Sequence, residues 1–176
     1  IYIRINPRFR INDHAFLQYI LAIEYEKNEF GWIDQLEDEP LFSRRHRKMF
    51  TNKLILDYTF SPKIYMKLIT RHYWSTINNK SFYEINTKGE LSTLKASNLS
   101  DLNINFNTWN LDLSFSWEYN PGSYLSILWQ NKLTKQTDSV ERVFFNNLNS
   151  FFENSTKNIF SIKLTYYLDY IKFKDF

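Results

Sequence analysis

Hydrophobic and polar residues alternate along much of this chain with a period of two, which is the period of a β-strand. The clearest case is residues 104–119, where one set of alternate positions is apolar and the other is polar. The segment 160–170 repeats this design. We therefore predict two strands that each have one apolar face and one polar face. The apolar set of the first is Trp109, Leu111, Leu113, Phe115, Trp117 and Tyr119.

Weaker alternation in other segments brings the prediction to about seven antiparallel strands. The connections between them alternate between short turns and long polar segments. Outer-membrane barrels have this asymmetry, with short periplasmic turns and longer extracellular loops. The predicted strands cover residues 1–11, 16–30, 47–60, 63–86, 104–119, 123–135 and 160–170; the short turns cover 12–14, 61–62 and 120–123, and the long connections cover 31–43, 87–103 and 136–157.

Strand length favours a transmembrane barrel over a soluble β-sandwich, whose strands would also alternate. The stretch from Trp109 to Tyr119 gives about 34 Å of strand, which a tilt of about 40° reduces to roughly 26 Å. The lipid-facing band of outer-membrane barrels is about 25 Å tall, with aromatic girdles at both edges. We therefore expect an all-β fold, the C-terminal portion of such a barrel. The expected lipid-facing girdle is Trp109, Trp117, Tyr119, Phe160 and Tyr170.

Composition excludes several other classes of protein. Aromatic residues make up 19% of the sequence, yet the mean hydropathy is negative. No run approaches the roughly 18 apolar residues of a transmembrane helix. Because there is no cysteine, a disulfide framework and a thiolate metal site are ruled out. The net charge of +3 is too small to indicate a nucleic-acid partner.

We expect the chain to be one piece of a longer protein. It does not begin with Met, and its first residues read as a strand rather than a signal peptide. With seven strands, the first and last run in the same direction and cannot pair antiparallel, and bacterial single-chain barrels have an even strand number. Residues 1–176 would then be the C-terminal part of one barrel domain, with further strands before Ile1. The last strand would deliver the terminal Phe176 to the periplasm, an aromatic end that barrel proteins commonly have.

Four segments resemble a Bacteroidota family of functionally uncharacterised outer-membrane barrels. They are Arg-His-Tyr-Trp at 71–74, Asn-Phe-Asn at 105–107, the Pro-Gly-Ser turn within 117–123, and the closing segment 164–170. The resemblance covers nearly the whole chain, although the family is usually described with Phe-Ala where this sequence has Tyr119-Asn120. It implies a preceding carbohydrate-binding domain, similar to family nine modules, outside this chain. It implies no catalytic residues.

No motif of a known catalytic or cofactor-binding site occurs in the sequence. The nucleophile elbow, the P-loop, the His-Glu-x-x-His helix and the dinucleotide fingerprint are all missing. His14, His46 and His72 lack the spacing of metal ligands. We therefore expect no enzyme, no cofactor and no metal.

Charged residues form one basic cluster and one mixed set. Arg44, Arg45, Arg47 and Lys48 begin the third predicted strand at its extracellular end. They either contact lipopolysaccharide phosphates or an acidic partner, or pair with the acids at positions 34, 37, 38 and 39 as a solvated rim, which is the favoured interpretation. The mixed set would line a neutralised lumen or contact a plug. It comprises Arg4, Arg8, Arg10, Asp57, Lys67, Arg71, Asp112, Glu118, Lys163 and Asp169.

The resulting hypothesis is a non-enzymatic protein of the bacterial outer membrane that serves transport or forms a subunit of an envelope complex, with a carbohydrate-related role as one option. Its expected partners are outer-membrane lipid, lipopolysaccharide and other outer-membrane or periplasmic proteins. Two alternatives stay open: a barrel enzyme with its active site at the rim, and a soluble all-β binding domain.

Overall fold

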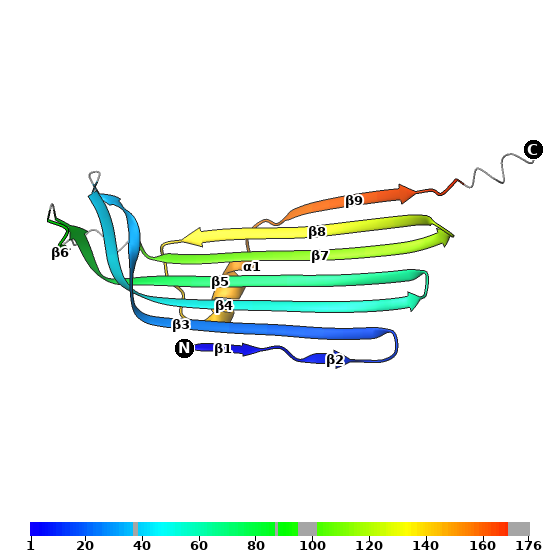
Figure 1. Ribbon diagram of the computed structural model, residues 1–176, viewed down its shortest axis with the longest axis horizontal. Coiled ribbons are helices and arrows are strands. Elements are labelled where there is room, and N and C mark those ends of the chain that lie inside the picture. Colours follow the sequence, from blue (N-terminus) through cyan, green and yellow to red (C-terminus); the bar gives the residue numbers. More distant parts are fainter. Residues whose placement is uncertain (37–38, 87, 95–101, 169–176) are drawn as a thin grey trace, which may run out of the picture.

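The fold is a single antiparallel β-sheet with one short helix, as the computed structural model shows (Figure 1). The structure describes residues 1–36, 39–86, 88–94 and 102–168. The strands are β1 (Tyr2–Ile5), β2 (Arg8–Arg10), β3 (Ala15–Leu36), β4 (Glu39–Ser61), β5 (Ile64–Ile85), β6 (Leu91–Leu94), β7 (Ile104–Asn120), β8 (Ser123–Thr137) and β9 (Lys157–Thr165), and the helix is α1 (Phe144–Phe152).

The predicted antiparallel all-β fold is confirmed. The strand order is β1-β3-β4-β5-β7-β8-β9, while β2 also pairs with β3 and β6 with β5. Among the described residues no pairing joins β9 to β1, so the sheet is open. The first predicted strand, 1–11, is two strands because Pro7 cannot donate a ladder hydrogen bond. Both lie along the same edge of β3, so the main path still has seven positions.

The prediction of a long loop at 31–43 is wrong. Instead, β3 and β4 continue as one hairpin, with Leu36 paired to Glu39. The composition of this segment is polar, but cross-strand aromatic contacts extend the ladder. The Phe30 ring stacks on Phe42 with centroids 5.7 Å apart and lies 5.4 Å from the Tyr83 ring on β5. As a result β3, β4 and β5 are 22, 23 and 22 residues long.

Three further boundaries differ from the prediction. The connection 87–103 contains β6, and the connection 136–157 contains α1. The last strand begins at Lys157 rather than at 160 and ends at Thr165, because its partner β8 begins at Ser123 and offers no ladder beyond Tyr124. Asp169, Tyr170 and Phe176, which the sequence placed in or after this strand, lie outside the described residues.

Strand register aligns the alternation of each strand with that of its neighbours. Leu113 pairs with Leu68 on β5 and Trp129 on β8, and Leu68 pairs with Leu56 on β4. Directly paired residues point to the same side of a sheet, so these side chains form one apolar face. We call it the apolar face, and the opposite side the polar face.

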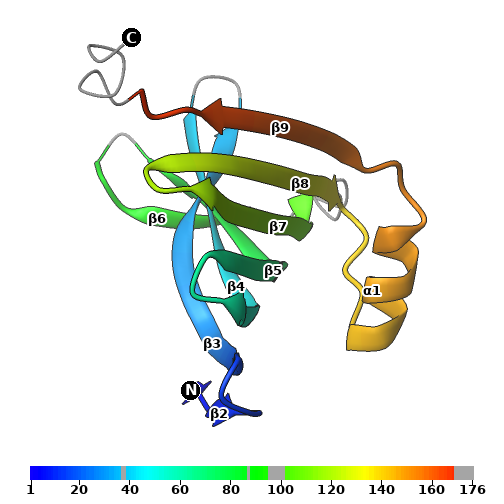
Figure 2. The ribbon, with the colours of Figure 1, turned by 90° about the vertical axis from the view of Figure 1, so that its right-hand side faces the viewer.

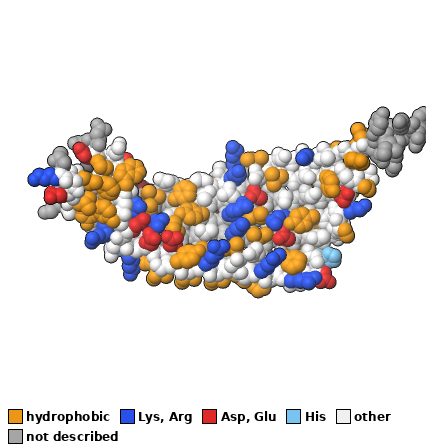
Figure 3. All heavy atoms as spheres, viewed as in Figure 1, with side chains coloured by type: hydrophobic (Ala, Val, Ile, Leu, Met, Phe, Trp, Pro, Cys, Tyr) orange, Lys and Arg blue, Asp and Glu red, His pale blue; other side chains and the backbone are white. Residues whose placement is uncertain are grey.

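The polar face carries every described residue of the mixed charged set. Asp112, for example, shares a register row with Ile69, Gln18 and Arg8. Figure 3 shows a face of the sheet on which Lys and Arg side chains lie beside Asp and Glu. The helix lies behind the strands in Figure 1 and to one side of them in Figure 2, so it covers the sheet on one face only.

The turn between β7 and β8 generates a testable prediction. Gly122 has φ +74, and a Cβ there would lie 3.0 Å from the Tyr167 Cβ, whereas Gly89 has φ +79 with nothing within 4 Å. Gly89→Ala should therefore lower the free energy of unfolding by about 1 kcal/mol through backbone strain alone. Gly122→Ala should cost about 1 to 3 kcal/mol, because contact with Tyr167 adds to the strain. Urea unfolding of the full-length variants would measure this, and equal losses would contradict the Tyr167 contact.

Candidate functional site

The apolar face is the most unusual surface of the molecule, because most of it has no second layer. Within the described residues the buried hydrophobic side chains are only Ala15, Leu41, Trp74, Leu133 and Phe151. On β9, Phe160 is 70% exposed and Ile162 is 73% exposed. A sheet with one apolar face is stable only when that face is covered. The single sheet is therefore incomplete without an apolar environment on this side.

The predicted girdle residues lie at different levels of the apolar face. Trp117 and Tyr119 form an edge contact, centroids 5.9 Å apart, near the short β7–β8 turn. Trp109 lies toward the other end of β7, five residues after Ile104, and its ring centroid is 5.2 Å from that of Phe152 of α1. Phe160 stacks on Trp129 with centroids 5.9 Å apart. Since Trp129 pairs with Leu113, this stack lies midway between the two ends rather than level with either.

Arg45 and Arg47 of the basic cluster are bound on the polar face by glutamates of β3. Arg47 lies 2.7 Å from Glu26 and 3.1 Å from Glu29, and Arg45 lies 3.3 Å from Glu29. The hydrogen bond between Arg47 and Glu26 raises the pKa of Arg47 and lowers the pKa of Glu26. These glutamates are not the acids at positions 34, 37, 38 and 39 with which the sequence predicted pairing, and positions 37 and 38 lie outside the described residues. Lys48 points to the opposite face.

Ion pairs continue along the polar face toward the short turns. Arg71 Nη1 lies 2.6 Å from Asp112 Oδ2, and the Gln130 side-chain amide donates to the other oxygen of Asp112 at 2.7 Å. Lys67 lies 3.1 Å from Asp57. Each cation in these pairs meets an anion on an adjacent strand. The polar face therefore carries ion pairs between adjacent strands and charges of both signs.

Helix α1 covers the apolar face at the end remote from the short turns. Phe144 contacts Phe50 and Trp74, with centroids 5.8 Å from each. Asn147 is 1% exposed, and its side-chain amide exchanges hydrogen bonds of 2.7 and 3.0 Å with Asn107. The Asn105 amide also donates to Asn147, at 3.2 Å. A buried amide cluster thus attaches the helix to β7.

Sequence reasoning missed this helix. Its sheet-facing residues Phe144, Asn147 and Phe151 have the three- and four-residue spacing of a helix face. That signal is short, and the N-cap Val143 makes no side-chain capping bond. Contacts with the sheet, rather than helix propensity, account for the helix.

The three histidines make different contacts. His14 Nδ1 lies 2.8 Å from the Thr59 carbonyl oxygen, His46 Nδ1 accepts from the Asn28 backbone N–H at 3.2 Å, and His72 is buried beside Asn107 at 3.3 Å. In the described part of the chain no group of three potential metal ligands comes together. None of the described helices has the length and apolar character of a membrane span.

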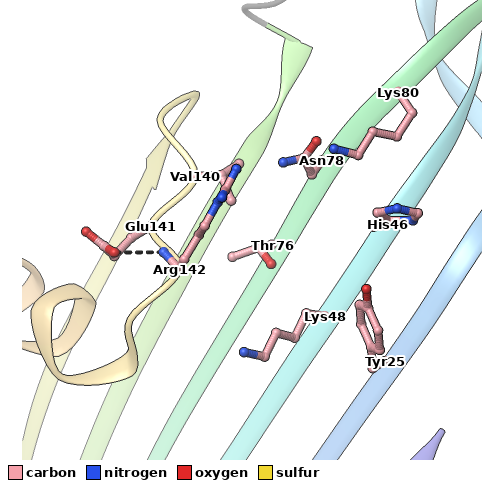
Figure 4. A pocket seen from close by; sticks show the side chains of 9 residues that line it. All are labelled: Tyr25, His46, Lys48, Thr76, Asn78, Lys80, Val140, Glu141 and Arg142. Carbon is pink, nitrogen blue, oxygen red and sulfur yellow. Dashed lines mark hydrogen bonds between the residues drawn. The ribbon is translucent and has the colours of Figure 1, made fainter.

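A cavity of about 320 Å³ lies just beyond α1, on the same side of the sheet as the helix. Strands β3, β4 and β5 form its floor, and residues 140–142, which lead into α1, form its wall (Figure 4). Lys48, Lys80 and Arg142 line it, together with the single carboxylate of Glu141. Of the predicted basic cluster, only Lys48 is part of this site.

A family model described as a domain of unknown function (DUF5916) matches residues 1–176 of the chain. No curated protein and no solved structure matches it.

The amide cluster under α1 leads to a prediction. Asn147→Leu should leave the side-chain NH2 groups of Asn105 and Asn107 without their acceptor, at a cost of about 1 to 3 kcal/mol for each buried group. We expect the helix to detach, so that trypsin cleaves the full-length protein faster after Arg142. Asn146→Leu is the matched control, because Asn146 is exposed on the same helix. Equal cleavage rates in the two variants would mean that the amide cluster does not hold the helix.

Proposed function

The chain belongs to the DUF5916 family of unknown function, and on that premise we propose that it forms part of the wall of a transmembrane β-barrel in a bacterial outer membrane. One observation carries the proposal. The sheet is a single layer with a continuous apolar face on one side and paired charges on the other. A barrel wall between lipid and a polar interior needs these two faces.

The exposed apolar face favours lipid as its covering. Leaving a leucine or isoleucine in water instead of burying it forgoes about 1.5 to 3 kcal/mol per side chain. Ile162 and Leu164 on β9, and Ile3 and Ile5 on β1, are at least half exposed. In lipid the same side chains would be stable without a second protein layer. The unpaired edges at β1 and β9 would join further strands of the full-length protein.

The height of the apolar face also supports a position in a membrane. Between the rows of Trp109 and Tyr119 the strand rises about 34 Å, or roughly 26 Å along the membrane normal at a tilt of about 40°. Helix α1 lies beside Trp109, at the upper limit of this band. It leaves Phe145 71% exposed and Phe152 42% exposed. Aromatic side chains at this level fit the interface between acyl chains and headgroups.

We propose a non-enzymatic role for this barrel, in transport or as a subunit of an envelope complex. The paired charges of the polar face, such as Arg71 with Asp112, favour a neutralised lining over a strongly ion-selective pore. Conductance of the full-length protein in planar bilayers separates the two roles. Discrete channels would support transport, whereas a silent protein that co-purifies with envelope proteins would support the complex.

The first prediction from this proposal concerns the depth dependence of arginine substitutions. Leu113→Arg should lower the free energy of unfolding by about 2 to 4 kcal/mol, because it places a charge near the middle of the bilayer. The penalty should decrease toward Trp109→Arg and Tyr119→Arg near the edges of the band. Ser114→Arg is the matched control, since Ser114 is the next residue but lies on the polar face. Refolding titrations of full-length variants in lipid vesicles would measure the profile.

Two outcomes would overturn the membrane proposal. One is a flat profile of penalties from position 109 to position 119. The other is cooperative folding of the wild-type protein in buffer that contains neither lipid nor detergent. A soluble sheet would also resist Leu113→Arg, because the charge would enter its core. In such a core the penalty for arginine would not decrease from position 113 toward positions 109 and 119.

A second prediction concerns topology. With the short turns in the periplasm, Ser139→Cys in the β8–α1 segment should react with a membrane-impermeant maleimide on intact cells. Asn120→Cys in the β7–β8 turn should react only after the cells are opened. Both positions are exposed, so accessibility within the protein does not bias the comparison. The reverse pattern would invert the orientation.

A further inference from the structure

We propose that the cavity beside α1 binds the phosphate group of a glycolipid headgroup in the outer leaflet. The proposal rests on the barrel proposed above and adds a ligand to it. The cavity is the open one in Figure 4, bordered by β3, β4, β5 and the segment that leads into α1. Its cationic residues are Lys48 on β4, Lys80 on β5 and Arg142 before the helix.

These three cations have no acidic partner among the described residues. No carboxylate there lies within ion-pair distance of Lys48, Lys80 or Arg142, although Arg45 and Arg47 nearby are both paired. Lys48 is instead held over aromatic rings, with Nζ 4.6 Å from the Phe50 centroid and 5.6 Å from that of Trp74. A cation–π contact of this kind positions an ammonium group and leaves its positive charge available to an anion.

The one carboxylate in the cavity is already engaged with the backbone. Glu141 accepts hydrogen bonds from the N–H groups of Arg142 at 2.7 Å and Val143 at 2.9 Å. These bonds lower the pKa of Glu141 and keep it ionised at neutral pH. Three cations and one carboxylate leave an excess of about two positive charges in the cavity. A phosphate group carries about this charge with the opposite sign.

Neutral donors complete the site. Tyr25, Thr76 and Asn78 line the same cavity and carry hydroxyl or amide groups that can donate to phosphate oxygens. His46 accepts the Asn28 N–H through Nδ1, so its Nε2 is the nitrogen left to carry a proton. A volume of about 320 Å³ accommodates a phosphate with part of the sugar to which it is attached.

The position of the cavity favours a lipid headgroup over a solute inside the barrel. Lys48 pairs with Thr76, and Thr76 pairs with Asn105, four residues beyond Trp109 on β7. Four residues correspond to about 14 Å of strand, or about 10 Å along the membrane normal. With an apolar band of about 25 Å and a total thickness of about 40 to 45 Å, the headgroups extend roughly 8 to 10 Å beyond the band, so the row of Lys48 lies at about their outer limit. Lys48 also shares the face of Phe50 and Trp74, which is the side turned to lipid in the proposed barrel.

The test compares two full-length triple variants. The first, Lys48→Gln, Lys80→Gln and Arg142→Gln, removes the cations of the cavity. The matched control, Lys53→Gln, Lys132→Gln and Lys163→Gln, removes the same charge from the polar face. Binding is measured by titrating the protein in detergent micelles with lipid A bearing two phosphates, with dephosphorylated lipid A, and with inorganic phosphate. We expect the first variant to weaken binding of phosphorylated lipid A at least tenfold, and the control to resemble wild type.

Three outcomes would overturn the proposal: equal binding by the two variants, equal binding of phosphorylated and dephosphorylated lipid A, or binding of inorganic phosphate as tight as that of the lipid. The last would identify a solute site. Insertion into phosphatidylcholine vesicles, measured in parallel, separates this failure from failure of the barrel. If the wild-type protein inserts but binds both lipids equally, only the phosphate-site proposal is overturned. If the wild-type protein does not insert, both proposals are overturned.

Discussion

A single-layer sheet cannot bury its own apolar face, and the rest of the structure depends on this constraint. Backbone hydrogen bonds hold the strands edge to edge, but they contribute nothing above or below the sheet. Here the described chain has few buried hydrophobic side chains, and apart from Ala15 they lie beside α1 or in the extension of β4. The stability of the remaining face must come from its surroundings.

The two faces divide the charged residues by role. On the polar face, several cations pair with anions from adjacent strands, as Arg47 does with Glu24, Glu26 and Glu29. On the opposite face, Lys48 lies only one residue away from Arg47 along β4 but contacts aromatic rings. Adjacent residues of a strand point to opposite sides. One short basic run therefore supplies ion pairs on the polar face and one cation to the cavity on the apolar face.

Helix α1 connects the apolar band with the cavity beyond it. Its phenylalanines continue the apolar surface, while Asn147 joins a polar cluster that the band could not otherwise accommodate. Buried amides are stable only when their donors and acceptors are paired. The helix thereby closes the upper end of the apolar face, and the residues that lead into it form one wall of the cavity.

The sequence by itself determined most of the strands, their antiparallel pairing and which residues share a face, because a period of two is a local property that Leu113 and Ser114 already display. It did not determine the hairpin extension at Phe30 and Phe42, or helix α1, because both depend on contacts between segments whose own composition favours loops. The cavity depends on tertiary structure more than these two features do. Lys48, Lys80 and Arg142 are far apart in the chain, and only strand register and the docking of α1 bring their charges together.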